Sequence, residues 1–141
     1  PGEYGGGYIQ KLFTNDLDPN DHPYFSEIYD LKVSSHLLIE RDGSLVQFVP
    51  FNKKAWHAGV SSFKGRENCN EFSIGIELEG TDENTYTEDQ YRALIDVTKE
   101  LMFVFRDIKK ENIVGHSDIA PGRKTDPGEA FDWHYYLSNL E

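Results

Sequence analysis

Residues 72–79 read Phe-Ser-Ile-Gly-Ile-Glu-Leu-Glu, and this stretch sets the fold class. Every second residue is large and apolar, while the residues between them are Ser, Gly and two Glu. This alternation predicts a strand with one face in the hydrophobic core. On the other face, the small Ser73 and Gly75 leave room beside Glu77 and Glu79 for a substrate or a metal-bound water. The pattern alone also fits a solvent-exposed strand face.

A hairpin precedes this strand and a long helix follows it. Residues 36–40 and 45–49 read as two strands joined by a tight Asp-Gly turn. Residues 88–105 carry apolar side chains at helical spacing, and Thr87 with Gln90 matches the capping-box pattern that begins a helix. Both elements are therefore predicted to pack against the sheet.

The remaining segments are shorter. Residues 9–13 and 23–28 predict a helical turn or two each, and residues 112–114 predict a short strand that enters a loop over 115–128. Residues 130–140 predict a closing helix. Together the elements predict a mixed α/β fold, with a central, mostly mixed β-sheet flanked by helices.

Composition excludes several classes of partner. No repeat or linker divides the sequence, so we expect residues 1–141 to form a single domain. Lys and Arg number 14 against 25 Asp and Glu, and the net charge of −11 argues against a nucleic acid or an anionic membrane surface as partner. The single Cys69 cannot form an internal disulfide, and no apolar run is long enough to span a membrane.

A group of candidate catalytic residues follows the predicted short strand. His116 and Asp126 lie ten positions apart, and imidazole nitrogen and carboxylate oxygen are both ligand types for zinc. Lys124 lies two residues before Asp126, where its charge could stabilise a developing oxyanion. From the residues alone, a turn-capping role for His116 and a solvated surface role for Lys124 remain open.

Aromatic residues form a second candidate group. Trp56 and His57 stand together in a loop that continues Ala-Gly, and Tyr24 belongs to another aromatic-rich segment. Such side chains could line a groove for a sugar or a peptide, so we take Tyr24, Trp56 and His57 as candidate substrate-binding residues. Ordinary core and rim packing explains them equally well.

Longer stretches match a known family over nearly the whole chain. They include residues 55–62 (AWHAGVSS) and 69–81 (CNEFSIGIELEGT). The others are residues 1–6, 17–20, 22–25, 41–43, 115–116, 119–121, 123–128 and 131–133. With these stretches the sequence resembles the type 2 N-acetylmuramoyl-L-alanine amidase family, which includes the peptidoglycan-recognition proteins, and the resemblance implies the fold of that family.

The resemblance implies a role for each matched residue. His116 and Asp126 match two zinc ligands, and Glu77 matches the residue assigned to acid and base catalysis on the attacking water. Lys124 matches the residue that stabilises the tetrahedral oxyanion. Arg123 matches a contact to the peptide part of the ligand. The cofactor implied by the resemblance is Zn²⁺.

The third zinc ligand of the family is a His at the end of a strand that precedes the stretch beginning at Pro1. That ligand therefore lies outside the 141 residues, and we interpret the sequence as N-terminally incomplete, without the first strand of the fold. We expect a chain limited to these residues to bind zinc weakly, to fold poorly and to be a poor enzyme.

The activity implied by the resemblance is hydrolysis of the amide between N-acetylmuramic acid, in its 1,6-anhydro form, and L-alanine of a muropeptide. The reaction would belong to peptidoglycan recycling in the cytoplasm, and we expect a monomer. One alternative is a non-catalytic peptidoglycan-binding module of the same fold, which would be expected to lack a ligand or the base. The other is a broader amidase that acts on the cell wall outside the cytoplasm.

Overall fold

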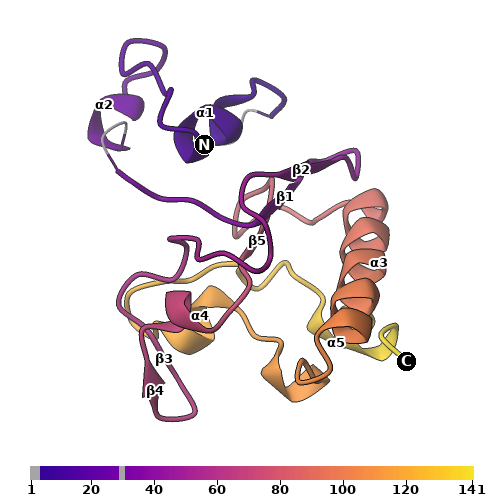
Figure 1. The fold of residues 1–141 in the computed structure, drawn as a ribbon. Coiled ribbons are helices and arrows are strands. Elements are labelled where there is room, and N and C mark those ends of the chain that lie inside the picture. Colours follow the sequence, from indigo (N-terminus) through magenta and orange to yellow (C-terminus); the bar gives the residue numbers. More distant parts are fainter. Residues whose placement is uncertain (1–3, 29–30) are drawn as a thin grey trace.

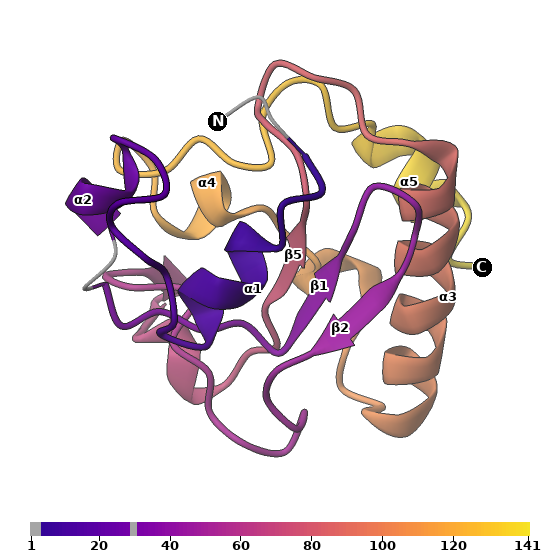
Figure 2. The same cartoon turned by 90° about the horizontal axis from the view of Figure 1, so that it is seen from above.

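Two groups of helices lie on opposite sides of a small central sheet in the computed structural model, which describes residues 4–28 and 31–141 (Figure 1). On one side lie α3 (Glu88–Val104) and α5 (Trp133–Ser138). The short helices on the other side, seen best in Figure 2, are α1 (Tyr8–Phe13), α2 (Phe25–Ile28) and α4 (His116–Ile119). The predicted mixed α/β class is confirmed.

The sheet has three strands in the order β2-β1-β5. β1 (Leu37–Ile39) pairs antiparallel with β2 (Leu45–Gln47), as the hairpin pattern predicted, and parallel with β5 (Ile76–Leu78). The parallel register sets Leu38 opposite Glu77. Because side chains alternate along a strand, these two residues share the face that points away from α3.

The core lies between the sheet and α3. Leu37 and Ile39 of β1 pack in one cluster with Leu94 and Ile95 of α3, and the aromatic residues Phe131 and Tyr136 close the cluster at α5. Ile39 is fully buried, and burial of such a side chain contributes about 1.5–3 kcal/mol. The sheet is thereby fixed on one face, which leaves the other face free to carry Glu77.

The capping box begins α3 as predicted. The Thr87 hydroxyl accepts the N–H of Gln90 at 3.1 Å, and the Gln90 side chain accepts the N–H of Thr87 at 3.1 Å. The Gln90 amide also donates to the carbonyl of Glu79 at 2.8 Å. The same residue therefore caps the helix and ties it to the residue that follows β5.

The strand predicted over residues 72–79 is shorter than expected, because only residues 76–78 have a pairing partner in β1. The preceding residues use other hydrogen bonds. Residues Cys69–Glu71 form a 3₁₀ turn, η1, and the N–H of Gly75 donates to Nδ1 of His36 at 3.1 Å. Strand length was thus set by the available partner rather than by the alternation.

Three other predicted elements need correction. The strand over 112–114 is wrong: Lys110–Asn112 form a 3₁₀ turn, and Ile113 is extended without a strand partner among the described residues. The loop over 115–128 contains α4, and the helix over 130–140 is limited to α5.

A second hairpin was missed by the sequence analysis. β3 (Ser62–Phe63) and β4 (Arg66–Glu67) are joined at Lys64 and Gly65, whose φ angles of 48° and 81° are both positive. Positive φ at both central residues is typical of a two-residue hairpin turn. Gly65 was the available signal, but Lys64 rarely adopts this conformation and hides the pattern.

The two N-terminal helices were predicted correctly and touch the sheet region through a few contacts. The N–H of Gly5 donates to Oε1 of Glu79 at 2.9 Å, and the Gln10 amide donates to Glu40 at 2.9 Å. The ring of Phe13 lies 5.5 Å from that of Phe48. Within the described residues, no helix combines the length and the apolarity needed to cross a membrane.

Candidate functional site

His116 and Asp126 come together at the beginning of α4. Gly115 precedes this helix, and its N–H donates to the Asp118 carboxylate at 2.7 Å, which caps the first turn. The N–H of Ser117 donates to the carbonyl of Asp126 at 3.0 Å and brings the following loop back to the helix. As a result, Nδ1 of His116 lies 3.1 Å from Oδ2 of Asp126.

Each partner shifts the pKa of the other. The hydrogen bond with Asp126 raises the pKa of His116 above its ordinary value of 6.5, although burial opposes the shift. Burial acts to raise the pKa of Asp126, but the hydrogen bond and the charge of His116 outweigh it and hold that pKa below its ordinary value. The hydrogen bond therefore favours the protonated form of His116 and the ionised form of Asp126.

The geometry of this pair suits a metal ion. Two ligands of tetrahedral zinc, each about 2.0 Å from the ion, lie about 3.3 Å apart. The 3.1 Å between His116 Nδ1 and Asp126 Oδ2 is close to that value. Within residues 4–28 and 31–141, no group of three or more His, Cys, Asp or Glu side chains is arranged to hold a metal. The described residues thus supply two metal donors at this point.

The ring of His116 is fixed from its other nitrogen as well. Nε2 lies 3.0 Å from the carbonyl oxygen of Ala58, to which it donates. With this hydrogen bond in place, the lone pair of a neutral His116 ring lies on Nδ1 and faces Asp126. Ala58 is 1% exposed, so its carbonyl is a fixed acceptor in the core.

Glu77 stands beside the pair on the sheet face that points away from α3. Burial raises the pKa of Glu77 to about 7, and the charge of Asp126 acts in the same direction. The charges of His116 and Lys124 oppose the shift. A carboxyl group with a pKa near neutrality can both accept and return a proton, which suits acid and base catalysis.

Lys124 lies at the exposed edge of this site. Its backbone N–H donates to the carbonyl of Ala120 at 3.0 Å, which holds the residue near the end of α4. The ammonium charge lowers the pKa of both Glu77 and Asp126. Lys124 is therefore close enough to act electrostatically on the centre of the site.

Arg123 lies at the site, but its guanidinium group is hydrogen-bonded to backbone carbonyls. Its guanidinium donates to the carbonyl of Ala58 at 2.6 Å and to that of Val60 at 2.8 Å. It also lies against Gly59, where a Cβ would come within 3.0 Å of Nη2. In this arrangement Arg123 donates to backbone carbonyls of residues 58–60 while its side chain remains exposed.

The other candidate substrate-binding residues differ in position. His57 is half-buried, and burial lowers its pKa to about 4, so its ring is neutral at physiological pH. Trp56 is 56% exposed, with the ammonium of Lys54 3.8 Å from its ring centre. Tyr24 lies just before α2, and its backbone N–H donates to His22 at 3.1 Å. His57 and Trp56 thus lie in the segment that leads to Ala58, whereas Tyr24 belongs to the N-terminal segment.

Two polar residues with structural importance escaped the sequence analysis. His36 is 1% exposed, accepts the N–H of Gly75 at Nδ1 and contacts the carbonyl of Lys53 through Nε2 at 2.7 Å. Asn70 is buried and accepts the N–H groups of both His57 and Ala58. Nothing local in the sequence distinguishes these buried residues from exposed ones.

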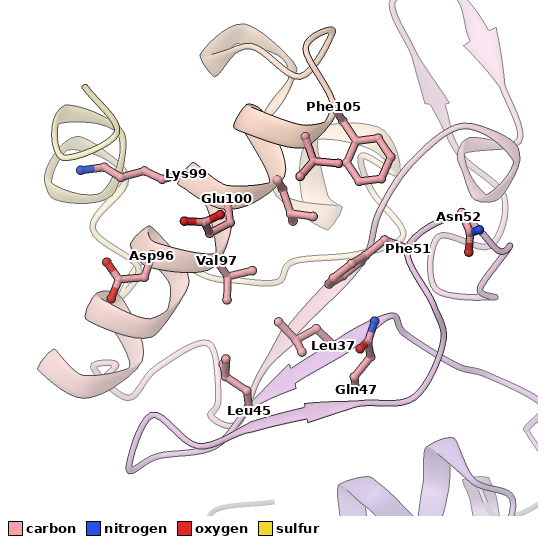
Figure 3. A pocket seen from close by; sticks show the side chains of 12 residues that line it. Leu37, Leu45, Gln47, Phe51, Asn52, Asp96, Val97, Lys99, Glu100 and Phe105 are labelled. Atoms are coloured by element: carbon pink, nitrogen blue, oxygen red, sulfur yellow. The ribbon is translucent and has the colours of Figure 1, made fainter.

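An apolar groove lies on another part of the molecule. Figure 3 shows a cavity of about 900 Å³ between the sheet and α3, with apolar side chains such as Leu37, Phe51 and Val97 turned toward it. None of the predicted site residues, all of which belong to the described part of the chain, lines this groove. The groove and the His116–Asp126 pair therefore occupy opposite sides of the sheet.

A carboxyl group of raised pKa beside a paired histidine and aspartate is an arrangement typical of hydrolases. The family follows from the sequence as a whole. Residues 8–129 match the N-acetylmuramoyl-L-alanine amidase family, and the chain belongs to that family.

Individual relatives cover most of the chain. The chain is 62% identical, over 133 residues, to the 1,6-anhydro-N-acetylmuramyl-L-alanine amidase AmpD of Escherichia coli K12, covering 94% of this chain and 72% of that protein. The crystal structure of a selenomethionine AmpD derivative matches with a TM-score of 0.97 at 57% identity, over 100% of this chain and 78% of the other. A complex of E. coli AmiD with the substrate anhydro-N-acetylmuramic acid-L-Ala-D-γ-Glu-L-Lys matches with a TM-score of 0.73 at 34% identity, over 83% and 51% of the two chains.

Proposed function

We propose that this protein hydrolyses the amide between 1,6-anhydro-N-acetylmuramic acid and L-alanine of muropeptides, with zinc as cofactor, in peptidoglycan recycling. The observation that carries the proposal is the 3.1 Å pairing of His116 Nδ1 with Asp126 Oδ2 beside Glu77, whose pKa is raised to about 7. Further support comes from the AmpD relatives, which are named for this activity, and from the AmiD complex with an anhydromuropeptide.

His116 and Asp126, together with a further ligand, would hold the zinc ion, which would supply Lewis acidity to the water and to the amide carbonyl. Glu77 takes a proton from the attacking water as its oxygen bonds to the carbonyl carbon. Lys124 stabilises the negative charge that develops on the carbonyl oxygen. Glu77 then returns the proton to the nitrogen of L-alanine as the C–N bond breaks, which leaves a carboxylate on the sugar and a free amine on the peptide.

Substrate recognition is assigned to the residues beside this centre. Trp56 offers an exposed ring for contact with the sugar. The neutral ring of His57 offers a nitrogen for a hydrogen bond to the substrate. Arg123 carries the charge expected to meet the peptide, although its donors now bind backbone carbonyls and must be shared or released. Tyr24, in the N-terminal segment, is proposed as a further contact to the ligand.

We place the reaction in the cytoplasm, where a muropeptide taken up for recycling would be met. The single Cys69, which is buried and free, is compatible with a reducing compartment. A second candidate is a broader amidase that also accepts muropeptides without the anhydro sugar, and the 40% identity over 120 residues to a relative named simply N-acetylmuramoyl-L-alanine amidase, AmiD of E. coli, supports it.

Side-by-side hydrolysis tests the two candidates. The full-length zinc-loaded protein would be incubated with an anhydromuropeptide and with the corresponding muropeptide that has an ordinary reducing sugar, and released peptide would be quantified by chromatography and mass spectrometry. The proposal expects much faster cleavage of the anhydro form and complete loss of activity in a chelator. Equal rates on both forms would support the broader amidase. Full activity in zinc-free protein would contradict the cofactor.

A further inference from the structure

Among the described residues, only the carbonyl of Ala58 is hydrogen-bonded to both His116 and Arg123. His116 donates to it from Nε2 at 3.0 Å, and Arg123 donates to it from Nη2 at 2.6 Å. The direction of this carbonyl therefore sets the direction of the His116 ring. The residues that hold this carbonyl therefore also influence the direction of Nδ1, the proposed metal donor on the other side of the ring.

Asn70 holds the backbone that carries this carbonyl. Its Oδ1 accepts the N–H of His57 at 3.0 Å and the N–H of Ala58 at 2.8 Å. Two neighbouring N–H groups converge on one atom, so that atom must be the amide oxygen and not the nitrogen. Asn70 is 9% exposed and sits in η1, twelve residues along the chain from Ala58, so the contact is a tertiary one.

Gly59 lets the chain turn directly after the held residue. Its φ of 62° is positive, and the guanidinium of Arg123 fills the space where a Cβ would lie. Three side chains therefore hold the backbone of Ala58: Asn70 accepts its N–H, while His116 and Arg123 donate to its carbonyl. Loss of Asn70 would leave two N–H groups without a partner in a water-poor place, and the segment would rotate to reach solvent.

We propose that Asn70 is a positioning residue for the metal-binding histidine. It acts through the Ala58 backbone, with Arg123 as the second restraint, and keeps Nδ1 of His116 directed at the metal. This inference rests on the proposed zinc site. Hydrogen-bonded groups behind a metal-binding histidine typically contribute 10- to 100-fold to metal affinity.

The experiment measures the zinc dissociation constant of the full-length protein by competition with a chromogenic chelator, in the absence of substrate. Asn70→Leu keeps the size of the side chain and removes the acceptor, whereas Asn70→Asp keeps an acceptor oxygen at the same place. Thr98→Val serves as the control for stability, because Thr98 is buried and hydrogen-bonded to Tyr136 at 2.6 Å, in the α3–α5 core away from the site. All measurements are made at a temperature where circular dichroism shows each variant to be folded.

We expect Asn70→Leu to weaken zinc binding by about 10- to 100-fold and Asn70→Asp to recover most of this loss. Thr98→Val is expected to lower the melting temperature and leave zinc affinity unchanged. Wild-type affinity in Asn70→Leu, or equal weakening in Thr98→Val, would overturn the inference. If the unaltered protein bound no zinc, the proposed cofactor would fail and this inference with it.

Arg123→Met removes the other restraint on Ala58, the hydrogen bond to its carbonyl. This variant tests the inference even if Asn70→Leu does not fold. The Arg123 side chain is exposed, so its replacement leaves the core intact. Zinc affinity is expected to fall several-fold, by less than in Asn70→Leu because one restraint on the carbonyl remains. Unchanged zinc affinity in Arg123→Met would show that the carbonyl needs no such support and would overturn the inference.

Discussion

Glu77 and Glu79 lie two residues apart in one extended segment, yet their carboxylates are in opposite situations. Both oxygens of Glu79 are bound, Oε1 by the N–H of Gly5 at 2.9 Å and Oε2 by the N–H of Arg41 at 3.0 Å. The carboxylate of Glu77 is governed by burial and by the charges of the site, and no hydrogen bond from the described part of the chain reaches it. Glu79 therefore fastens the N-terminal segment to the sheet, whereas Glu77 is free to exchange a proton.

This difference predicts different effects of two matched substitutions. Glu77→Gln should keep zinc and substrate binding but lose about 10²-fold or more in kcat, because Gln cannot accept the proton from water. Glu79→Gln keeps one acceptor oxygen for a backbone N–H and should reduce kcat only mildly, while lowering the melting temperature. Steady-state kinetics with zinc content measured in the same samples would decide. Equal damage from both substitutions would remove Glu77 from its assigned role.

Ionisation of Glu77 should destabilise the metal-free protein. Its pKa rises from 4.5 to about 7 on folding, so the folded state binds the proton more tightly than the unfolded state does. The destabilisation is absent below about pH 4.5, grows as pH rises, and is complete above about pH 7. Because part of the side chain remains accessible to solvent, we expect about 1–2 kcal/mol in place of the full value of the shift.

Glu77→Gln removes this ionisation and supplies the measurement. The metal-free variant should be more stable than the metal-free wild type at pH 8, and the difference should disappear near pH 4. Urea unfolding at both pH values would test it, with Glu79→Gln as the control that should not gain stability at pH 8. A Glu77→Gln variant that is less stable than the wild type at both pH values would show that ionisation of buried Glu77 does not destabilise the fold.

Protons should compete with zinc at His116. The hydrogen bond to Asp126 raises the pKa of His116 above 6.5, and a metal can bind Nδ1 only after that proton leaves. Apparent zinc affinity should therefore fall about tenfold per pH unit below the His116 pKa, and this decline should begin above pH 6.5. Chelator competition between pH 5.5 and 8 would measure it. A flat profile through this range would argue against His116 as a ligand.

Gly75 should tolerate no side chain. A Cβ at this position would overlap the ring of His57, so Gly75→Ala must displace that ring or the beginning of β5. We expect a loss of about 1–3 kcal/mol in stability, typical of overpacking, together with reduced kcat because Glu77 follows two residues later. Gly65→Ala is the control, since nothing lies within 4 Å of a Cβ there and only its positive φ opposes the change. Wild-type stability and kcat in Gly75→Ala would contradict the close packing of His57 on Gly75.

Local patterns predicted the elements that depend on near neighbours in the chain. The Thr87–Gln90 capping box began α3 at the expected residue, and the Asp-Gly turn joined β1 to β2. The alternation in residues 72–79 also separated Ile76 and Leu78, which pack against the core, from Glu77 on the opposite face. Matches to a family over long stretches then brought His116 and Asp126 forward, which composition and spacing alone had left open.

The rest depended on contacts between residues distant in the sequence. The strand predicted over 72–79 shrank to 76–78 because only these residues found a partner in β1, and Ile113 stayed extended but unpaired. The pKa of Glu77 rose because the fold buries it, and no local pattern encodes the depth of burial.

For the site, the sequence by itself determined which side chains were chemically able to act, because residue type fixes their ligand and proton-transfer chemistry. Only the tertiary structure decided how they are used. It turned Arg123 toward the carbonyls of Ala58 and Val60, and it brought Asn70 beneath the backbone that supports His116. Hydrogen bonds have a strict distance and direction, and these are set only when segments far apart in the chain have packed together.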